Sequence, residues 1–203
     1  MNTRIFREYD IRGLADTDLP DTVVNAIGRA IAALAQPGKI VVGRDCRLTS
    51  PRLFKALTEG IRITHEVIDI GIVPTPVAYF AQQHFDPAAT IMITGSHNPA
   101  GDNGFKIMVG SQTLHGEAIT SLGKRVEQLL SAPIEMATKT ITSIDVTPDY
   151  LARAKAELRL GARRPRIVVD AGNGSGGPTA RALYEALGFD VIPIYCDFDG
   201  NFP

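Results

Sequence analysis

The sequence has little cysteine, no tryptophan and no long apolar run. Its 203 residues include two cysteines, Cys46 and Cys196, which lie far apart and show no metal-ligand spacing. This pattern favours a reducing compartment over a disulfide scaffold. No run of about 18 or more apolar residues occurs, so no membrane span is expected. The N-terminus lacks the apolar core of a signal peptide, and we therefore expect a soluble, cytoplasmic protein.

The sequence also lacks an excess of charge of either sign. It has 21 Lys and Arg residues against 22 Asp and Glu residues, a formal net charge of −1. That balance gives no reason to expect binding to nucleic acid or to a membrane. With 44% hydrophobic and 21% charged residues the composition is that of a folded chain, and its length suits one large or two small domains.

Strand-type and helix-type apolar patterns alternate along the chain. The patterns predict strands at 39–43, 66–70, 89–93, 105–109, 166–170 and 189–195. They predict helices between Pro20 and Gly38 and at 50–61, 75–81, 116–130, 148–160 and 178–187. Strands joined through helices indicate an α/β fold, with a mixed sheet and flanking helices in layers.

A domain boundary is expected between residues 131 and 148. This stretch is rich in Thr, Ser and Pro, and helical periodicity is lost there. We expect a first domain at 1–147 and an incomplete second α/β domain at 148–203, because one β-α-β unit cannot easily cover both faces of its own sheet.

The stretch from Thr94 to Pro99 is the strongest candidate for chemistry. It places Ser96 where the apolar run 89–93 stops, between Gly95 and His97. Glycine permits a close approach of the backbone to a ligand, and proline fixes the loop exit. The pattern predicts a serine that carries or receives a phosphoryl group, with His97 orienting the phosphate or donating a proton. The alternative is a plain loop serine in a turn.

Two basic residues near strand ends are further candidates. Lys106 sits within the apolar run 105–109, where it either faces a phosphate or occupies the solvent side of the strand. Arg44 directly follows the strand at 39–43, and its planar guanidinium suits phosphate recognition. The alternative for Arg44 is a structural cluster with Asp45 and Arg47 that braces a loop.

The segment 6–13 concentrates four charges and a tyrosine in eight residues. Tyr9 could reach a sugar or a phosphate, and Arg12 could form an anion-binding turn. A surface lead-in segment is the alternative.

The loop at 172–177 is a second candidate for ligand binding. Gly172, Gly174 and Gly177 fit a G-x-G-x-x-G pattern between a strand and a helix, and Asp197 and Asp199 follow roughly 20 residues on. Matched alone, this pattern indicates a dinucleotide-dependent oxidoreductase. The favoured interpretation is a tight turn whose glycines permit close packing, because so short a pattern is often met by chance.

The motifs together resemble the N-terminal part of the α-D-phosphohexomutases, the phosphomannomutase/phosphoglucomutase family. The resemblance rests on seven segments, at 6–13, 43–45, 73–76, 94–99, 103–106, 168–174 and 199–203. It implies that Ser96 is a phosphoserine and that the glycine loop is a structural turn. It also implies reversible conversion of hexose 1-phosphate and hexose 6-phosphate through a hexose 1,6-bisphosphate. Residues 9–12 are closer to the mannose/glucose branch than to the glucosamine branch.

The resemblance assigns roles to residues and names the missing parts. It implies catalytic roles for Ser96, His97, Lys106 and Arg12 and substrate contacts for Tyr9, Arg12, Asn98 and Arg44. Mg²⁺ would bind through the phosphate on Ser96 and aspartates that residues 1–203 lack. The family's sugar and phosphate loops are absent as well, so we expect no mutase activity from these residues alone. A non-catalytic folded fragment is the alternative for residues 1–203. The expected partner is a phosphosugar, and a monomer is favoured.

Overall fold

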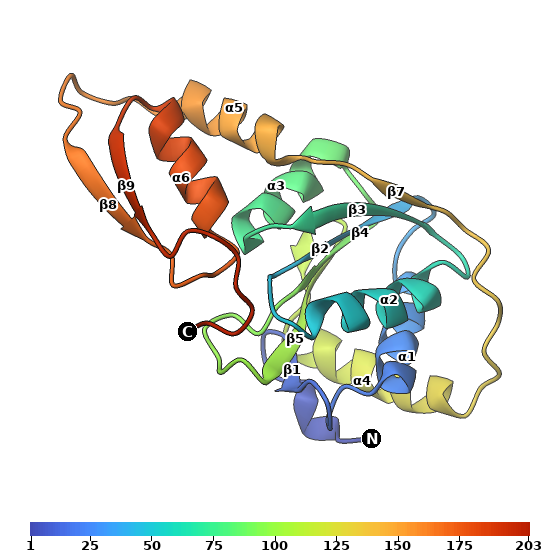
Figure 1. The fold of residues 1–203 in the computed structure, drawn as a ribbon. Coiled ribbons are helices and arrows are strands. Elements are labelled where there is room, and N and C mark those ends of the chain that lie inside the picture. The colour runs from blue at the N-terminus through green and yellow to red at the C-terminus, as the bar shows by residue number, and fades with distance from the viewer.

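A mixed β-sheet organises the first two thirds of the chain in the computed structural model, which describes residues 1–203 (Figure 1). Its strands are β1 (Ile11–Leu14), β2 (Lys39–Arg44), β3 (Glu66–Ile72), β4 (Ala89–Ile93), β5 (Asp102–Val109), β6 (Gln112–Thr113) and β7 (Ile141–Ser143). The order is β1-β5-β4-β2-β3-β7, with β6 paired to β5. Strands β2, β3, β4 and β7 are parallel, whereas β1, β5 and β6 join by antiparallel pairing.

Helices cover both faces of this sheet (Figure 1). They are α1 (Asp21–Ala32), α2 (Ser50–Ile61), α3 (Thr75–Phe85) and α4 (Glu117–Leu130), preceded by a short 3-10 helix, η1 (Thr3–Ile5). Helices α1, α2 and α4 pack on one face and α3 on the other. Because successive strand residues point to opposite faces, Ile40 and Val42 join the larger core while Val41 joins the smaller one. The predicted layered α/β fold is confirmed.

Strand β4 is buried at all five positions. This matches its continuous apolar sequence, since a strand covered by helices on both faces has no solvent side. The strand therefore delivers the residues that follow it to the edge of the core at a fixed point.

The N-terminal segment is part of this sheet rather than a surface lead-in. Strand β1 pairs with β5, and Ile11 faces Phe105 across the pair. Ile5 and Ile11 are almost fully buried in the larger core. In the sequence, the many charged residues around Ile5 and Ile11 gave no indication that these two residues are buried.

The stretch expected to hold a domain boundary also contributes to the sheet. Strand β7 lies within it and extends the sheet by pairing with β3. Helix α5 (Thr147–Glu157) starts directly afterwards. The boundary at 147/148 stays a prediction, although β7 places residues 141–143 with the first unit.

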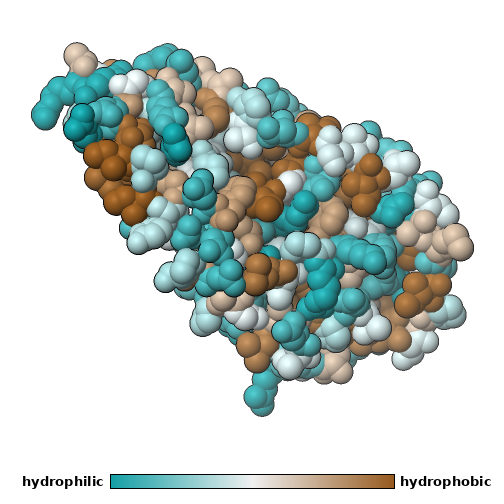
Figure 2. Space-filling model, viewed as in Figure 1, coloured by the Kyte–Doolittle hydropathy of each residue, from teal (hydrophilic) through white to brown (hydrophobic).

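The rest of the chain forms a smaller unit beside the first (Figure 1). It consists of α5, β8 (Arg166–Asp170), α6 (Gly177–Ala186) and β9 (Asp190–Ile194), with β8 and β9 parallel. One face of this two-stranded sheet is open, and Val168, Ile192 and Ile194 are exposed there. Figure 2 shows hydrophobic side chains gathered over these strands. None of the helices in the structure has both the length and the apolar character to cross a bilayer.

Candidate active site

Ser96 lies in an exposed loop at the end of β4. Its backbone is left-handed, with φ 56°, a conformation that serine rarely adopts. The Ser96 amide donates to the Thr94 hydroxyl at 2.9 Å, and Oγ of Ser96 lies 3.4 Å from Nδ1 of His97. The hydroxyl has no shorter contact, so it is free to face a ligand. Backbone strain at an exposed polar residue is typical of functional positions.

Arg12 and Lys106 meet next to this loop through a shared carboxylate. Oδ2 of Asp10 accepts from Nη2 of Arg12 at 2.6 Å and from Nζ of Lys106 at 3.3 Å. Nη1 of Arg12 donates to Oδ1 of Asn98 at 2.9 Å, which ties the cluster to the loop that carries Ser96. Of the predicted residues, Arg12, Lys106 and Asn98 are thus linked in one cluster, and His97 lies beside Ser96.

Asp10 is a site residue that sequence reasoning missed. It is 7% exposed, and it faces two cations. Its position in the sequence, two residues before the predicted site residue Arg12, could have indicated it. One carboxylate shared by two cations leaves the cluster with excess positive charge, which favours an incoming anion. Nε of Arg12 is buried and has no hydrogen-bond acceptor, so the cluster also holds an unused donor.

Tyr79 on α3 is affected by the charge of Asp10. Burial raises the pKa of its phenol, and the negative charge of Asp10 raises the pKa further. The raised pKa keeps the phenol protonated, and so able to donate a hydrogen bond, to a higher pH than for an ordinary tyrosine.

Asp45 and Arg47, which follow β2 in the chain, hold the serine loop in place through hydrogen bonds. Asp45 accepts from the Ser50 hydroxyl at 2.6 Å and from the Gly95 amide at 3.2 Å. Arg47 pairs with Asp45 and donates to backbone carbonyls of the loop. The structural interpretation of this cluster therefore holds for Asp45 and Arg47. Ser50 is the first residue of α2, and its hydroxyl donates to Asp45.

Arg44 does not belong to the Asp10 cluster. Its Nη1 is paired with Oδ1 of Asp69 at 2.7 Å, and its guanidinium lies 4.5 Å from the ring centroid of Phe54. It lines a groove shared with α6 and Phe198 of the smaller unit. Contact with a substrate stays a prediction for Arg44. The same holds for Tyr9, which is 71% exposed next to Asp10.

The glycine loop has the geometry of a structural turn. The Gly172 amide donates to Asp170, the Asn173 amide to the Tyr195 carbonyl and the Gly174 amide to the Ala171 carbonyl. A Cβ on Gly177 would lie 2.3 Å from the Cys196 carbonyl oxygen, so glycine is needed there for close packing. These amides already have hydrogen-bond acceptors within the protein, whereas a dinucleotide site needs free amides to bind pyrophosphate.

Residues 1–203 offer no ready metal centre. The structure contains no group of three or more His, Cys, Asp or Glu side chains placed to hold a metal ion. Binding of Mg²⁺ stays a prediction.

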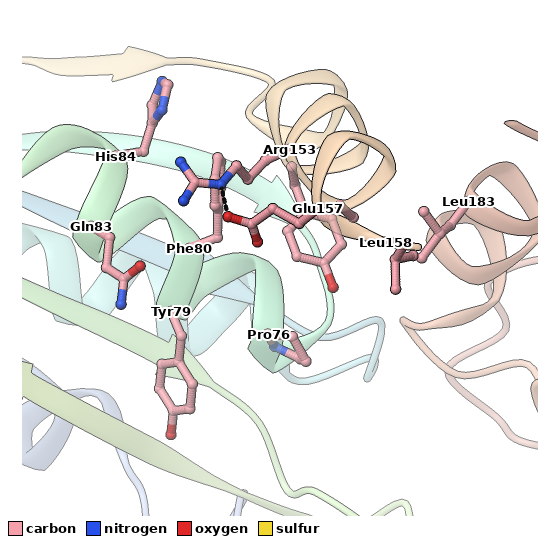
Figure 3. Close-up of a pocket in the computed structure, with 11 residues that line it drawn as sticks. Pro76, Tyr79, Phe80, Gln83, His84, Arg153, Glu157, Leu158 and Leu183 are labelled. Carbon is pink, nitrogen blue, oxygen red and sulfur yellow. Dashed lines mark hydrogen bonds and ion pairs between the residues drawn. The ribbon is translucent and has the colours of Figure 1, made fainter. Parts of the chain in front are cut away.

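A groove of about 790 Å³ lies apart from the serine loop, between α3, α5 and α6 (Figure 3). Arg153 and Glu157 are paired in it, and Phe80 packs edge-on against Tyr150 at 5.6 Å between ring centroids. Tyr79 lies at its margin and points away from the ion pair. The groove contains none of the site residues predicted from the sequence.

The α/β layers and the serine loop define an α/β/α domain of the phosphohexomutase class. The family model described as phosphoglucomutase/phosphomannomutase, alpha/beta/alpha domain I, matches residues 3–131, and the chain belongs to this family. A phosphomannomutase/phosphoglucomutase of Pseudomonas aeruginosa is 41% identical over 98% of this chain, and a phosphoglucomutase of Neisseria meningitidis is 42% identical over 98%. The chain spans 43% and 44% of these proteins.

A solved structure agrees with this assignment. The crystal structure of a phosphoglucomutase/phosphomannomutase family protein from Burkholderia thailandensis superposes with a TM-score of 0.89 at 37% identity. The match covers 100% of this chain and 46% of that one. The fold of residues 1–203 is therefore that of a phosphohexomutase N-terminal part.

Proposed function

We propose that this chain carries the phosphoserine of a phosphomannomutase/phosphoglucomutase, an isomerase that interconverts hexose 1-phosphate and hexose 6-phosphate. The observation that carries the proposal is Ser96, exposed in a strained loop beside the Arg12–Asp10–Lys106 cluster. In a phosphoryl transfer the protein mainly positions the groups and neutralises charge, and this cluster is suited to both tasks.

Each residue near Ser96 has a role in this proposal. Phospho-Ser96 gives its phosphoryl group to a bound hexose phosphate, and the hexose 1,6-bisphosphate returns the other phosphoryl group to Oγ. Lys106 and Arg12 stabilise negative charge on the group in transfer. Nδ1 of His97 is near enough to Oγ to exchange its proton. Asn98 holds Arg12 against the loop.

The ligands follow from the same chemistry. The proposed substrates are phosphosugars, and Tyr9 and Arg44 are proposed to contact them. Mg²⁺ is proposed as the cofactor because hard oxygen ligands, including those of a phosphate on Ser96, suit it. We further propose a monomer in the cytoplasm, and no turnover by residues 1–203 alone.

The proposal is tested by steady-state assays of Ser96→Ala. The variant is made in a protein that contains this chain and has the full length of the relatives. With glucose 1-phosphate, glucose 1,6-bisphosphate and Mg²⁺, we expect turnover to fall at least about 1,000-fold, as for loss of a covalent nucleophile. The matched control is Ser111→Ala, which removes an exposed turn hydroxyl outside the site. Tandem mass spectrometry should detect a phosphate on Ser96 in the wild-type protein. Near-normal turnover in Ser96→Ala would overturn the proposal.

A further inference from the structure

Arg47 is a buried guanidinium whose every N–H group has an acceptor. Its side chain is 2% exposed. Nε donates to Oδ2 of Asp45 at 3.1 Å. Nη1 donates to the carbonyls of Pro99 at 2.5 Å and Asp102 at 2.9 Å, and Nη2 to those of Ser96 at 3.0 Å and Asn98 at 2.7 Å. These contacts use all five donors that arginine possesses.

The backbone carbonyls that Arg47 binds belong to Ser96 and to residues that follow it in the loop. The Ser96 carbonyl fixes the peptide plane that follows the serine, and the Asn98 and Pro99 carbonyls fix the exit of the loop. Asp45 holds the entry by accepting from the Gly95 amide. Arg47 and Asp45 together therefore constrain the backbone on either side of Ser96.

The left-handed backbone of Ser96 needs such a constraint. A non-glycine residue in this region is strained and persists where the surroundings impose it. The Ser96 side chain contributes little, since its one contact is the long one to His97. The hydrogen bonds to Arg47 and Asp45 hold this backbone together with two local ones, from the Ser96 amide to the Thr94 hydroxyl and from the Asn98 amide to the Gly95 carbonyl.

The last residues of the chain close the remaining side of Arg47. The guanidinium lies 5.3 Å from the ring centroid of Phe202, within the range of a cation–π contact. The neighbouring Cys46 donates through Sγ to the Asn173 carbonyl at 3.4 Å. The smaller unit thus reaches the loop 45–48 at two points and covers the guanidinium that holds the serine loop.

We propose that Arg47 is a positioning residue for Ser96, setting the backbone that aims the hydroxyl, and that Phe202 of the smaller unit keeps Arg47 in that position. The proposal rests on the proposed phosphoserine function for its catalytic consequence. Its structural content, the conformation of residues 95–99, stands independently of turnover. Arg47 touches no solvent-facing surface of the site, so substrate affinity is not expected to depend on it.

Two measurements on Arg47→Lys test this. Lysine keeps the charge but cannot reach five acceptors. In residues 1–203 we expect the amides of residues 95–98 to exchange hydrogen about tenfold faster, while those of β2 stay unchanged. In a protein of the relatives' length that carries the chain, kcat should fall about 100-fold with the KM for glucose 1-phosphate within about twofold. Arg52→Lys is the control, because Arg52 also donates to two backbone carbonyls but away from Ser96.

Chemical rescue and Phe202 extend the test. Guanidinium added to Arg47→Ala should recover activity, whereas methylammonium should not. If Arg47→Ala fails to fold, Phe202→Ala is the deciding variant, and we expect it to show faster exchange at residues 95–98 and a lower kcat. Tyr195→Ala, which removes an exposed aromatic side chain of the smaller unit, should leave both unchanged. Wild-type exchange and kcat in both Arg47→Lys and Phe202→Ala would overturn the proposal. So would a fall in kcat/KM that comes from KM alone. If phosphate never appears on Ser96 in the unmodified protein, the proposed function fails, and the exchange data still decide the positioning role.

Discussion

Gly95 and Arg47 are packed so closely that no side chain fits between them. A Cβ built on Gly95 would lie 2.6 Å from Cζ of Arg47 and 2.7 Å from its Nε. The backbone before Ser96 and the guanidinium that braces it are therefore in direct contact. Any side chain at position 95 has to displace Arg47 from its hydrogen bonds.

Gly95→Ala is expected to disturb the loop from the opposite side to Arg47→Lys. The added methyl group competes with a buried, fully bonded guanidinium, and we expect a loss of about 2 kcal/mol in the free energy of unfolding. Urea denaturation of residues 1–203 measures this. Gly101→Ala is the matched control, because a Cβ at Gly101 meets nothing within 4 Å. Equal stability of the two variants would contradict the packing described here.

Ser96→Gly should be more stable than Ser96→Ala. Both variants lack the hydroxyl, but the left-handed backbone at φ 56° is free of strain only for glycine. We expect a difference of about 1 kcal/mol in the free energy of unfolding. Thermal or urea denaturation of the pair measures it, and a more stable alanine variant would mean that the loop does not hold this conformation in solution.

The N-terminal segment should show a pH-dependent contribution to stability through Asp18. A hydrogen bond from the Asn2 amide lowers the pKa of Asp18 below its ordinary value of 3.8, assisted by the Leu14 amide and the charge of Arg7. A lowered pKa in the folded state means that the stabilisation is fully present above pH 3.8 and is lost as the pH falls through the folded value.

Asp18→Asn tests this linkage. At neutral pH we expect a loss of about 0.5 kcal/mol, since the site is close to solvent. The gap between variant and wild type should close in acid, where the protonated carboxyl resembles the amide. Thr17→Ala, in the same exposed loop, is the control, because it removes no titratable group and its stability difference from the wild type should not change with pH. A gap that is constant with pH would refute the assignment to Asp18.

Cys46 should react slowly with alkylating reagents at neutral pH. Burial raises the pKa of its thiol, and the charge of Asp45 raises the pKa further, so little thiolate forms. We expect iodoacetamide to modify Cys46 at least about tenfold more slowly than the same thiol in the urea-unfolded chain. Peptide mass spectrometry separates this site from Cys196. An equal rate in both states would show that the contact between Cys46 and the smaller unit is open in solution.

Local patterns were sufficient for most of the fold. The apolar runs at 39–43 and 89–93 predicted β2 and β4 because a strand buried on both faces has an unbroken apolar sequence. The edge strand β7 was not predicted, for the opposite reason. All three residues of β7 are exposed, and their strand conformation comes from pairing with β3 rather than from their own sequence.

The candidate site was predicted where it is contiguous and missed where it is assembled from distant segments. Ser96 and its neighbours stand in one motif that sequence alone could single out. Arg47 acts on carbonyls about 50 residues later in the chain, a relation that no spacing rule contains. Asp10 was missed because its importance depends on Lys106, which approaches it only through the pairing of β1 with β5.

The open face of the β8–β9 sheet has a practical consequence for handling residues 1–203. Each of the two strands has one edge without a partner strand, and Val168 is 59% exposed on the open face of the sheet. Unpaired strand edges beside apolar side chains favour pairing with another chain. Concentrated samples should therefore be checked by light scattering for self-association through this sheet before any spectral change is attributed to the serine loop.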